Sequence, residues 1–138
     1  MLTCYFLPMV SKTGQHALKA LTELAKLPDG TFAAVEAIAK EINAPRNYLG
    51  KLLQILTRAG LVRSQKGIGG GFRLTQDARK TTLYEIIELT DHVSRWDNCF
   101  MGKGVCSSDA ACSVHHKWKK TRDSYLKFLR GTTIADFL

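Results

Sequence analysis

The chain has 138 residues, with 20 Lys and Arg residues against 12 Asp and Glu residues and a formal net charge of +8. This length suits one domain, or one domain with an appended element, and it allows a sizeable buried core. The sequence lacks both an apolar run of the roughly 20 residues that a membrane span needs and the pattern of a signal peptide, so we expect a cytoplasmic protein. The basic excess favours a polyanionic partner, nucleic acid before a membrane surface.

Residues 1–8 follow neither a helical nor a strand period, and Met9 comes directly after them. We therefore interpret them as an N-terminal extension. Ser11 or Thr13 can then cap a helix over residues 14–27, which the turn sequence Pro-Asp-Gly ends. Apolar residues recur along this helix at the spacing of one buried face, at Ala17, Leu18, Leu21, Leu24 and Ala25.

Two shorter helices are predicted next, over residues 33–42 and 46–59, and each carries one apolar stripe. Between them, Asn43 tolerates the left-handed conformation of a tight turn, and Pro45 suits a helix start because its missing N–H needs no partner there. This arrangement predicts a helix-turn-helix, whose second helix enters the major groove of DNA by its N-terminus. An ordinary helical hairpin is the alternative.

The following residues predict a β-hairpin, with strands at 61–64 and 72–75 around a glycine-rich turn. A hairpin after a helix-turn-helix is a wing, and its slim cationic tip suits phosphates or a minor groove. A nucleotide-binding loop is disfavoured, because such a loop leads from a strand into a helix, whereas a strand follows here. We therefore predict a mainly α chain in which residues 9–82 form a winged helix-turn-helix DNA-binding domain.

We predict DNA contacts from side chains on the recognition helix and the hairpin. These residues are Arg46, Asn47, Tyr48, Lys51, Arg63, Lys66 and Arg73. The amide of Asn47 can pair with adenine, whereas Lys66 and Arg73 are expected to meet phosphate or a groove without distinguishing bases. Gly50 belongs to the same face of the recognition helix and has no side chain with which to read a base.

Residues 83–138 are predicted to hold a short helix at 83–90, a cysteine-containing loop and a long helix at 114–130. The long helix carries an apolar stripe of Val114, Trp118, Tyr125, Leu126 and Leu129, opposite a polar face of Lys117, Lys119, Lys120, Arg122 and Lys127. This stripe could cover the winged domain, but it also suits a symmetric homodimer that reads two half-sites, which we favour. A final turn is expected to bury Ile134, Phe137 and Leu138.

The loop between these helices spaces three cysteines and a histidine as Cys99-x6-Cys106-x5-Cys112-x2-His115. A structural zinc site usually draws its ligands as pairs with about two to four residues between them, and both cysteine gaps here are wider. Structural disulfides suit small secreted domains and fit three clustered cysteines poorly. Wide gaps on a glycine-bearing loop suit an iron–sulfur cluster, in which His can replace Cys. A zinc or thiol redox site and inert cysteines remain as alternatives.

His115 and His116 are both candidates for a fourth ligand. If a helix begins near Ser113, His115 follows Cys112 by three residues, so that the two can face the same side of its first turn. His116 then points elsewhere, and we interpret it as a surface histidine.

Together these features resemble the bacterial Rrf-type winged-helix regulators, the group of IscR, NsrR and RirA, over about residues 9–138. The motifs that carry the resemblance are Asn43-Ala44-Pro45-Arg46-Asn47-Tyr48-Leu49, residues 58–63, the wing at 67–74, the cysteine loop and Thr133-Ile134-Ala135-Asp136. The resemblance implies a homodimer in which the long helices cross and each subunit holds a 2Fe–2S or 4Fe–4S cluster. In regulators similar to IscR the fourth ligand is a histidine that matches His115, whereas nitric-oxide sensors use a carboxylate where this chain has Gln15.

We therefore predict a non-enzymatic, dimeric transcription regulator, a repressor, whose operator binding is controlled by an iron–sulfur cluster on Cys99, Cys106, Cys112 and His115. Residues 83–138 then supply the cluster-binding loop and the dimerisation helix. The alternative is a DNA-binding regulator that senses redox state through zinc or thiols. An iron–sulfur electron carrier is less favoured, because the sequence resembles no flavin site, nucleotide site or catalytic dyad.

Overall fold

The computed structural model describes residues 9–75, 77–109 and 111–138, so the extension predicted at 1–8 lies outside the described residues. The α-helices and strands are α1 (Lys12–Ala25), α2 (Val35–Ile42), α3 (Arg46–Arg58), β1 (Val62–Gln65), β2 (Gly71–Leu74), α4 (Leu83–Asp91) and α5 (His115–Gly131). The 3-10 helices are η1 (Ala78–Lys80), η2 (Val93–Asp97) and η3 (Ile134–Phe137). Each predicted helix and strand has a counterpart whose bounds differ from the prediction by at most two residues. The 3-10 helices η1 and η2 were not predicted.

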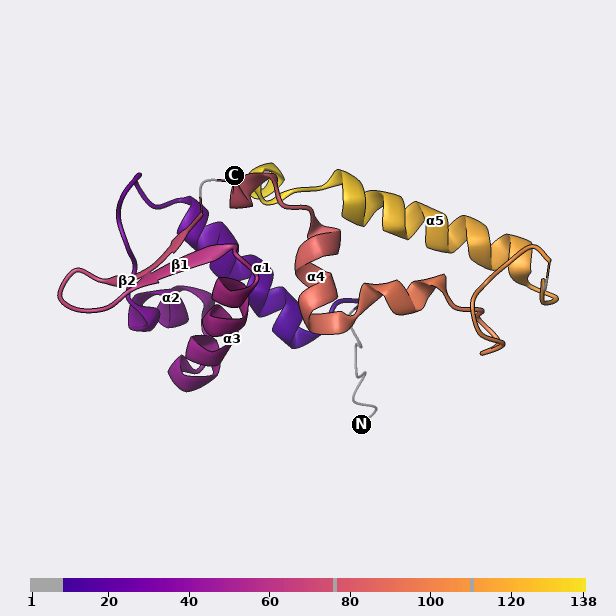
Figure 1. Ribbon diagram of the computed structural model, residues 1–138, viewed down its shortest axis with the longest axis horizontal. Coiled ribbons are helices and arrows are strands. Elements are labelled where there is room, and N and C mark those ends of the chain that lie inside the picture. Colours follow the sequence, from indigo (N-terminus) through magenta and orange to yellow (C-terminus); the bar gives the residue numbers. More distant parts are fainter. Residues whose placement is uncertain (1–8, 76, 110) are drawn as a thin grey trace, which may run out of the picture.

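The molecule is elongated, and its two ends hold different parts of the chain. Figure 1 shows α1, α2, α3 and the hairpin gathered at one end, while α5 runs toward the other end, where the cysteine loop lies. Among the described residues, no helix combines the length and the apolar character that crossing a membrane requires.

The helix-turn-helix forms as its sequence predicted. Asn43 has a left-handed backbone conformation, with φ 53° and ψ 53°, at the end of α2. The N-cap residue of α3 is Pro45, whose fixed φ suits the entry to a helix. The N-cap residue of α1 is Ser11, whose hydroxyl accepts a hydrogen bond from the Gly14 N–H at 3.0 Å. A side-chain acceptor at this position satisfies one of the N–H groups that a helix start leaves unpaired.

The wing consists of β1 and β2, which pair antiparallel with Val62 opposite Leu74 and Gln65 opposite Gly71. Ala33 forms a bridge with the edge of β2 that points away from β1. It exchanges two backbone hydrogen bonds of 2.8 Å with Phe72. Only glycine allows this approach, because a Cβ at Gly71 would lie 2.2 Å from the carbonyl oxygen of Ala33. The wing is thereby fastened to the segment that leads into α2.

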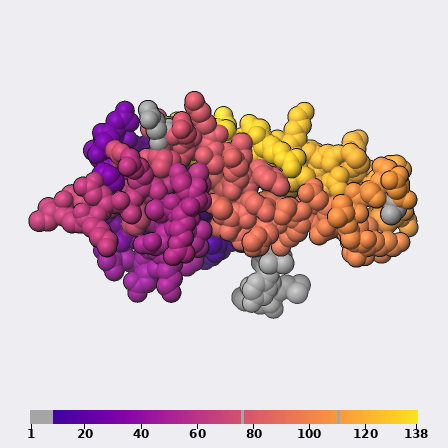
Figure 2. All heavy atoms as spheres, in the orientation of Figure 1, coloured from indigo at the N-terminus to yellow at the C-terminus, as the bar shows by residue number. Residues whose placement is uncertain are grey.

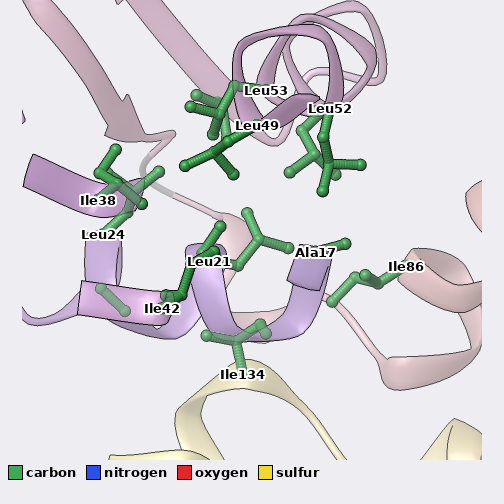
Figure 3. Packing of buried hydrophobic residues seen from close by; sticks show 14 of the residues in the cluster. Ala17, Leu21, Leu24, Ile38, Ile42, Leu49, Leu52, Leu53, Ile86 and Ile134 are labelled. Carbon is green, nitrogen blue, oxygen red and sulfur yellow. The ribbon is translucent and has the colours of Figure 1, made fainter. Parts of the chain in front are cut away.

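The main core surrounds α1, as Figure 3 shows. Ala17 and Ala20 of α1 are fully buried, and their small side chains let neighbouring helices approach closely. The boundary predicted between residues 82 and 83 does not interrupt this core, because Ile86 of α4 and Ile134 of η3 are buried in it. A second cluster joins α4 to α5 through Leu83, Ile87, Val93, Leu126 and Leu129.

Parts of the predicted C-terminal packing were wrong. Arg122 was expected on the polar face of the long helix, yet it is only 9% exposed and pairs with Asp123 at 3.1 Å. Val114 was expected in the apolar stripe, but it precedes the first turn of α5 and is exposed. Phe137 and Leu138 are also exposed, because the short helix η3 turns only Ile134 into the core.

A polar contact joins the start of α1 to the end of α4. Asp91 accepts hydrogen bonds from both the backbone N–H and the hydroxyl of Ser11, the former at 2.7 Å. Gly14 makes room for this contact, because a Cβ there would come within 3.1 Å of the Asp91 carboxylate. Burial opposes ionisation of Asp91, but these hydrogen bonds outweigh it and hold its pKa below the ordinary value.

We predict that Asp91→Asn lowers the free energy of unfolding by roughly 1 kcal/mol at neutral pH, because an amide accepts these hydrogen bonds less strongly than a carboxylate. A carboxyl whose pKa is depressed by folding stabilises the protein above its unfolded pKa of about 3.9, and this stabilisation is lost as pH falls through the folded value. The difference from wild type should therefore vanish in acid. Urea unfolding at several pH values measures it.

The matched control is Asp77→Asn, which removes an exposed carboxylate from the connector before η1. Its stability should follow that of the wild type at every pH. An equal loss in both variants would show that overall charge, and not the Ser11 contact, determines the effect.

Candidate DNA-binding face and cysteine loop

The start of α3 presents a polar surface. Arg46, Asn47 and Lys51 are exposed there and, together with Gly50, line a shallow groove that the wing residue Phe72 closes on one side. Arg46 pairs with Glu36 at 2.5 Å, which orients its guanidinium across the first turns of α2 and α3. The side chains predicted to meet base edges and phosphates from the start of α3 thus lie together on one open face.

Tyr48 differs from its neighbours because it is half-buried against α1. Its ring packs edge-on against His16 with centroids 5.4 Å apart, and its hydroxyl lies 3.4 Å from Nδ1 of that histidine. Burial, and then the charges of Lys19 and Lys12, lower the pKa of His16. Tyr48 therefore packs the recognition helix against α1. Its contact with DNA stays a prediction.

The tip of the wing is the most exposed part of the domain. Lys66 and Ile68 stand out into solvent, and the isoleucine is as exposed as a free side chain, at 107%. Figure 2 shows the hairpin as a narrow projection at one end of the molecule. Such a tip can reach into a groove of DNA, where a cation meets phosphate and an apolar side chain covers sugar or base edges. The full exposure of Ile68 was not predicted from the sequence.

Arg63 and Arg73 lie on a different side of the wing. They stand directly opposite each other in the hairpin register, while the adjacent residues Val62 and Phe72 face the core. Because side chains alternate along a strand, the two arginines occupy the outer face, whereas Phe72 shares a groove with α3. The structure therefore does not place these two predicted DNA contacts on the same face as Asn47.

The cysteine loop is built on a short antiparallel bridge between Asn98 and Val105. Within it the Cys99 N–H donates to the Gly104 carbonyl at 2.7 Å, and the Cys106 N–H donates to the Asp97 carbonyl at 2.8 Å. Gly104 has φ +88°, which a glycine adopts without strain. These bonds curl the chain back, so that Cys99 and Cys106 come to one end of α5.

The thiols and the histidine occur in two contacts. Cys106 Sγ lies 3.2 Å from Nδ1 of His115, which is only 3% exposed. Backbone N–H groups of Lys103 and Met101, the Cys112 thiol and the charge of Lys103 lower the pKa of the buried Cys99 thiol. His115 begins α5 and approaches Cys106, whereas the sequence had suggested a side shared with Cys112.

Aromatic side chains fasten this loop to α5. Trp118 stacks on Trp96 with centroids 5.4 Å apart, lies equally close to Phe100, and donates its indole N–H to the Asn98 carbonyl at 3.2 Å. Trp96 also packs on Tyr125 at 4.6 Å. The sequence did not predict this cluster, because Trp96 lies in η2, a short segment without the apolar spacing that indicates a helix.

The chemistry of the donor set, three thiols and an imidazole, fits a thiophilic metal or cluster. Within the described residues, no group of three or more His, Cys, Asp or Glu side chains is close enough to hold a metal ion. His115 Nε2 is nevertheless buried, and it has no hydrogen-bond partner among the described residues. A buried imidazole nitrogen without a partner is costly, and coordination or a bound ligand would satisfy it.

Comparison with known proteins also indicates a transcriptional regulator. Residues 10–138 match the family model Rrf2, described as an iron-dependent transcriptional regulator. A protein of Aquifex aeolicus (strain VF5) that carries the name of an HTH-type transcriptional regulator is 38% identical over 130 residues, which cover 93% of this chain and 90% of that protein. A Synechocystis protein with the same kind of name is 33% identical over 122 residues, covering 88% and 81%.

Solved structures confirm the winged-helix fold. CymR of B. subtilis, called the global cysteine regulator, has a TM-score of 0.77 at 25% identity and covers 96% of this chain and 99% of its own. The oxidized form of Staphylococcus aureus CymR scores 0.71 at 26% identity, with 93% and 94% covered. IscR of T. potens scores 0.73 over 94% and 85%, and at 24% identity this likeness shows the fold alone.

We predict that Asn47→Ala weakens binding by about 1–3 kcal/mol at one operator position and changes binding to random duplex DNA little, because its amide reads a base. Lys66→Ala should weaken binding to both DNAs alike and flatten the salt dependence, because a lysine at the wing tip meets phosphate. Fluorescence anisotropy on a selected operator, its single-base variants and random DNA measures both effects. Equal losses of Asn47→Ala on operator and random DNA would contradict base reading.

Proposed function

The chain belongs to the Rrf2 family of transcriptional regulators, and from this premise we propose that it is a homodimeric repressor controlled by an iron–sulfur cluster. Binding to DNA and the lack of enzymatic activity follow from the family. The cluster, the dimer and repression are the proposed parts. As a regulator of operator DNA, the protein would work in the cytoplasm, where a bacterial chromosome lies.

The proposed ligands are Cys99, Cys106, Cys112 and His115. The observation that carries the proposal is the buried, partnerless Nε2 of His115 beside a loop that holds three free thiols among the described residues. The lowered pKa of Cys99 supports it further, because thiolates are the form in which cysteines bind metals. Both a 2Fe–2S and a 4Fe–4S cluster remain open.

A bound cluster would supply a redox-sensitive centre that can be lost or modified. The chain's own residues determine what such a change reaches. His115 is the first residue of α5, and Trp118 in the next turn holds Asn98 at the edge of the loop. The arrangement of the ligands is thereby tied to the direction and the first turns of α5.

The cysteine loop and the recognition helix α3 lie toward opposite ends of the elongated molecule (Figure 1). A change in the loop therefore has to act through α5 and a second subunit, by altering the spacing between two recognition helices. This is a two-state equilibrium biased by a ligand.

The proposed dimer uses the free face of α5. Leu126 and Leu129 of the predicted stripe are buried within the chain itself, whereas Phe128 is 57% exposed. Thr121 and Ser124 precede it at helical spacing and are exposed too. The face turned outward thus combines small residues with one large apolar side chain, which suits close packing of a symmetry-related helix.

A thiol-based regulator is the second candidate function. The Cys112 thiol contributes to lowering the pKa of the Cys99 thiol. A peroxide could oxidise these two thiols to one disulfide, taking up two electrons and two protons. The structural likeness to CymR, solved also in an oxidized form, supports this candidate, and zinc on the same thiols is a variant of it.

We predict that protein purified without oxygen absorbs visible light, contains iron and sulfide, and loses the absorption in Cys99→Ala, Cys106→Ala and Cys112→Ala. His115→Ala should destabilise the cluster or shift its spectrum, because it removes the fourth ligand. His116→Ala is the matched control, because this neighbouring histidine is exposed, and it should resemble wild type. Circular dichroism checks that each variant folds. A colourless protein that contains zinc, or that binds DNA according to thiol oxidation alone, would favour the second candidate.

We also predict that Phe128→Glu converts the dimer to a monomer and weakens operator binding by at least about tenfold, because a charge is costly in a packed helix interface and one half-site is then read alone. Light scattering after size exclusion measures the mass. The control is Ala37→Glu, which adds the same charge to an exposed position on α2 and should remain dimeric. A Phe128→Glu dimer would place the interface elsewhere.

A further inference from the structure

The wing domain has a second concave surface that the DNA-binding role does not use. It is a pocket of about 450 Å³ between the end of α1, the turn at 28–31 and β2. Leu24, Leu27, Pro28 and Leu74 give it apolar walls. Small-molecule sites commonly measure roughly 300–1,000 Å³ and combine such walls with a few polar groups.

Two arginines face this pocket from the outer side of the hairpin. Arg63 and Arg73 are directly opposite each other across the ladder and share one face. Like charges in such positions repel. The guanidinium of Arg73 lies over the Phe32 ring, 5.0 Å from its centroid, and its Nε is buried without a hydrogen-bond partner in the described chain. This buried donor lacks the acceptor that its burial calls for.

A third arginine completes the rim. Arg79 donates a hydrogen bond of 2.5 Å from Nη2 to the Ala25 carbonyl at the end of α1, which fixes its position. Asp29 is the acidic residue of the described lining, and none of the ion pairs within the described residues joins it to an arginine. Three arginines against one carboxylate give the lining a net charge of +2.

We infer that this pocket binds a small organic oxyanion, a compound with a phosphate or carboxylate group and a compact apolar part. Guanidinium groups recognise both groups through paired hydrogen bonds. The anion pairs with the guanidinium groups of Arg73 and Arg63 and offsets the repulsion between them. Its apolar part contacts Leu27 and Leu74.

Phosphates of duplex DNA fit this pocket less well. Arg63 and Arg73 occupy the outer face of the hairpin, whereas the hairpin residue next to α3 is Phe72. The Nε of Arg73 is buried, so the backbone of a duplex cannot reach it. The pocket is concave, in contrast to the protruding wing tip.

The test measures the melting temperature of the full chain with inorganic phosphate or succinate against sodium chloride at equal ionic strength. One of the two anions should raise the melting temperature of wild type by roughly 2 °C or more. Arg73→Gln, and Arg63→Gln at an exposed position, should both lose this rise. Lys80→Gln is the matched control, because it removes an exposed charge next to the pocket without lining it, and it should keep the rise.

A second arm measures DNA binding of the same variants. Affinities of Arg63→Gln and Arg73→Gln for duplex DNA should stay within about twofold of wild type, as for ordinary surface substitutions. The inference is overturned if neither anion exceeds chloride, if Lys80→Gln loses the rise equally, or if both arginine variants lose affinity for operator and random DNA alike. The last result would assign the arginines to the DNA backbone.

Discussion

Close packing around α1 is the constraint on which the rest of the structure depends. Ala17 and Ala20 are fully buried, so that α2, α3 and α4 can all lie against one helix. A larger side chain at either position would have to push one of them away, because a packed core has no spare volume. The recognition helix and the platform of α5 are therefore positioned by the same few residues.

This shared support also explains how a signal can travel along the chain. Asp91 fastens the end of α4 to the start of α1, and α4 in turn carries α5 through the second cluster. The winged unit and the C-terminal part of α5 are therefore joined by continuous packing, and the N-terminal end of α5 extends to the cysteine loop. Aromatic stacking between Trp96 and Trp118 makes that loop a rigid continuation of α5. In the proposed dimer, such an arm would convert a small change in the loop into a displacement between subunits.

The sequence predicted the elements better than their faces. Apolar spacing at a helical period, together with the turn at Asn43, locates α1, α2 and α3, because this spacing is the main signal of an amphipathic helix. The burial of Arg122 escaped this reasoning, since an arginine counts as polar whichever way its long stem packs. The contact between Cys106 and His115 also escaped it, because loop bonds such as Cys106 N–H to Asp97 bring the two together and follow no period.

The wing shows most clearly why roles cannot be assigned from charge alone. Lys66 at its tip and Arg73 in its second strand look equivalent in sequence as cations of one hairpin. Strand parity separates them, because the register places Arg73 beside Arg63 on one face of the hairpin, while Lys66 lies exposed in the turn beyond the paired residues. Shifting the pairing by a single residue would turn the arginines toward α3 and the phenylalanine toward solvent. The bridge that Gly71 permits between Phe72 and Ala33 opposes this shift, so one glycine helps to fix which side chains of the wing face α3 and which face the other side.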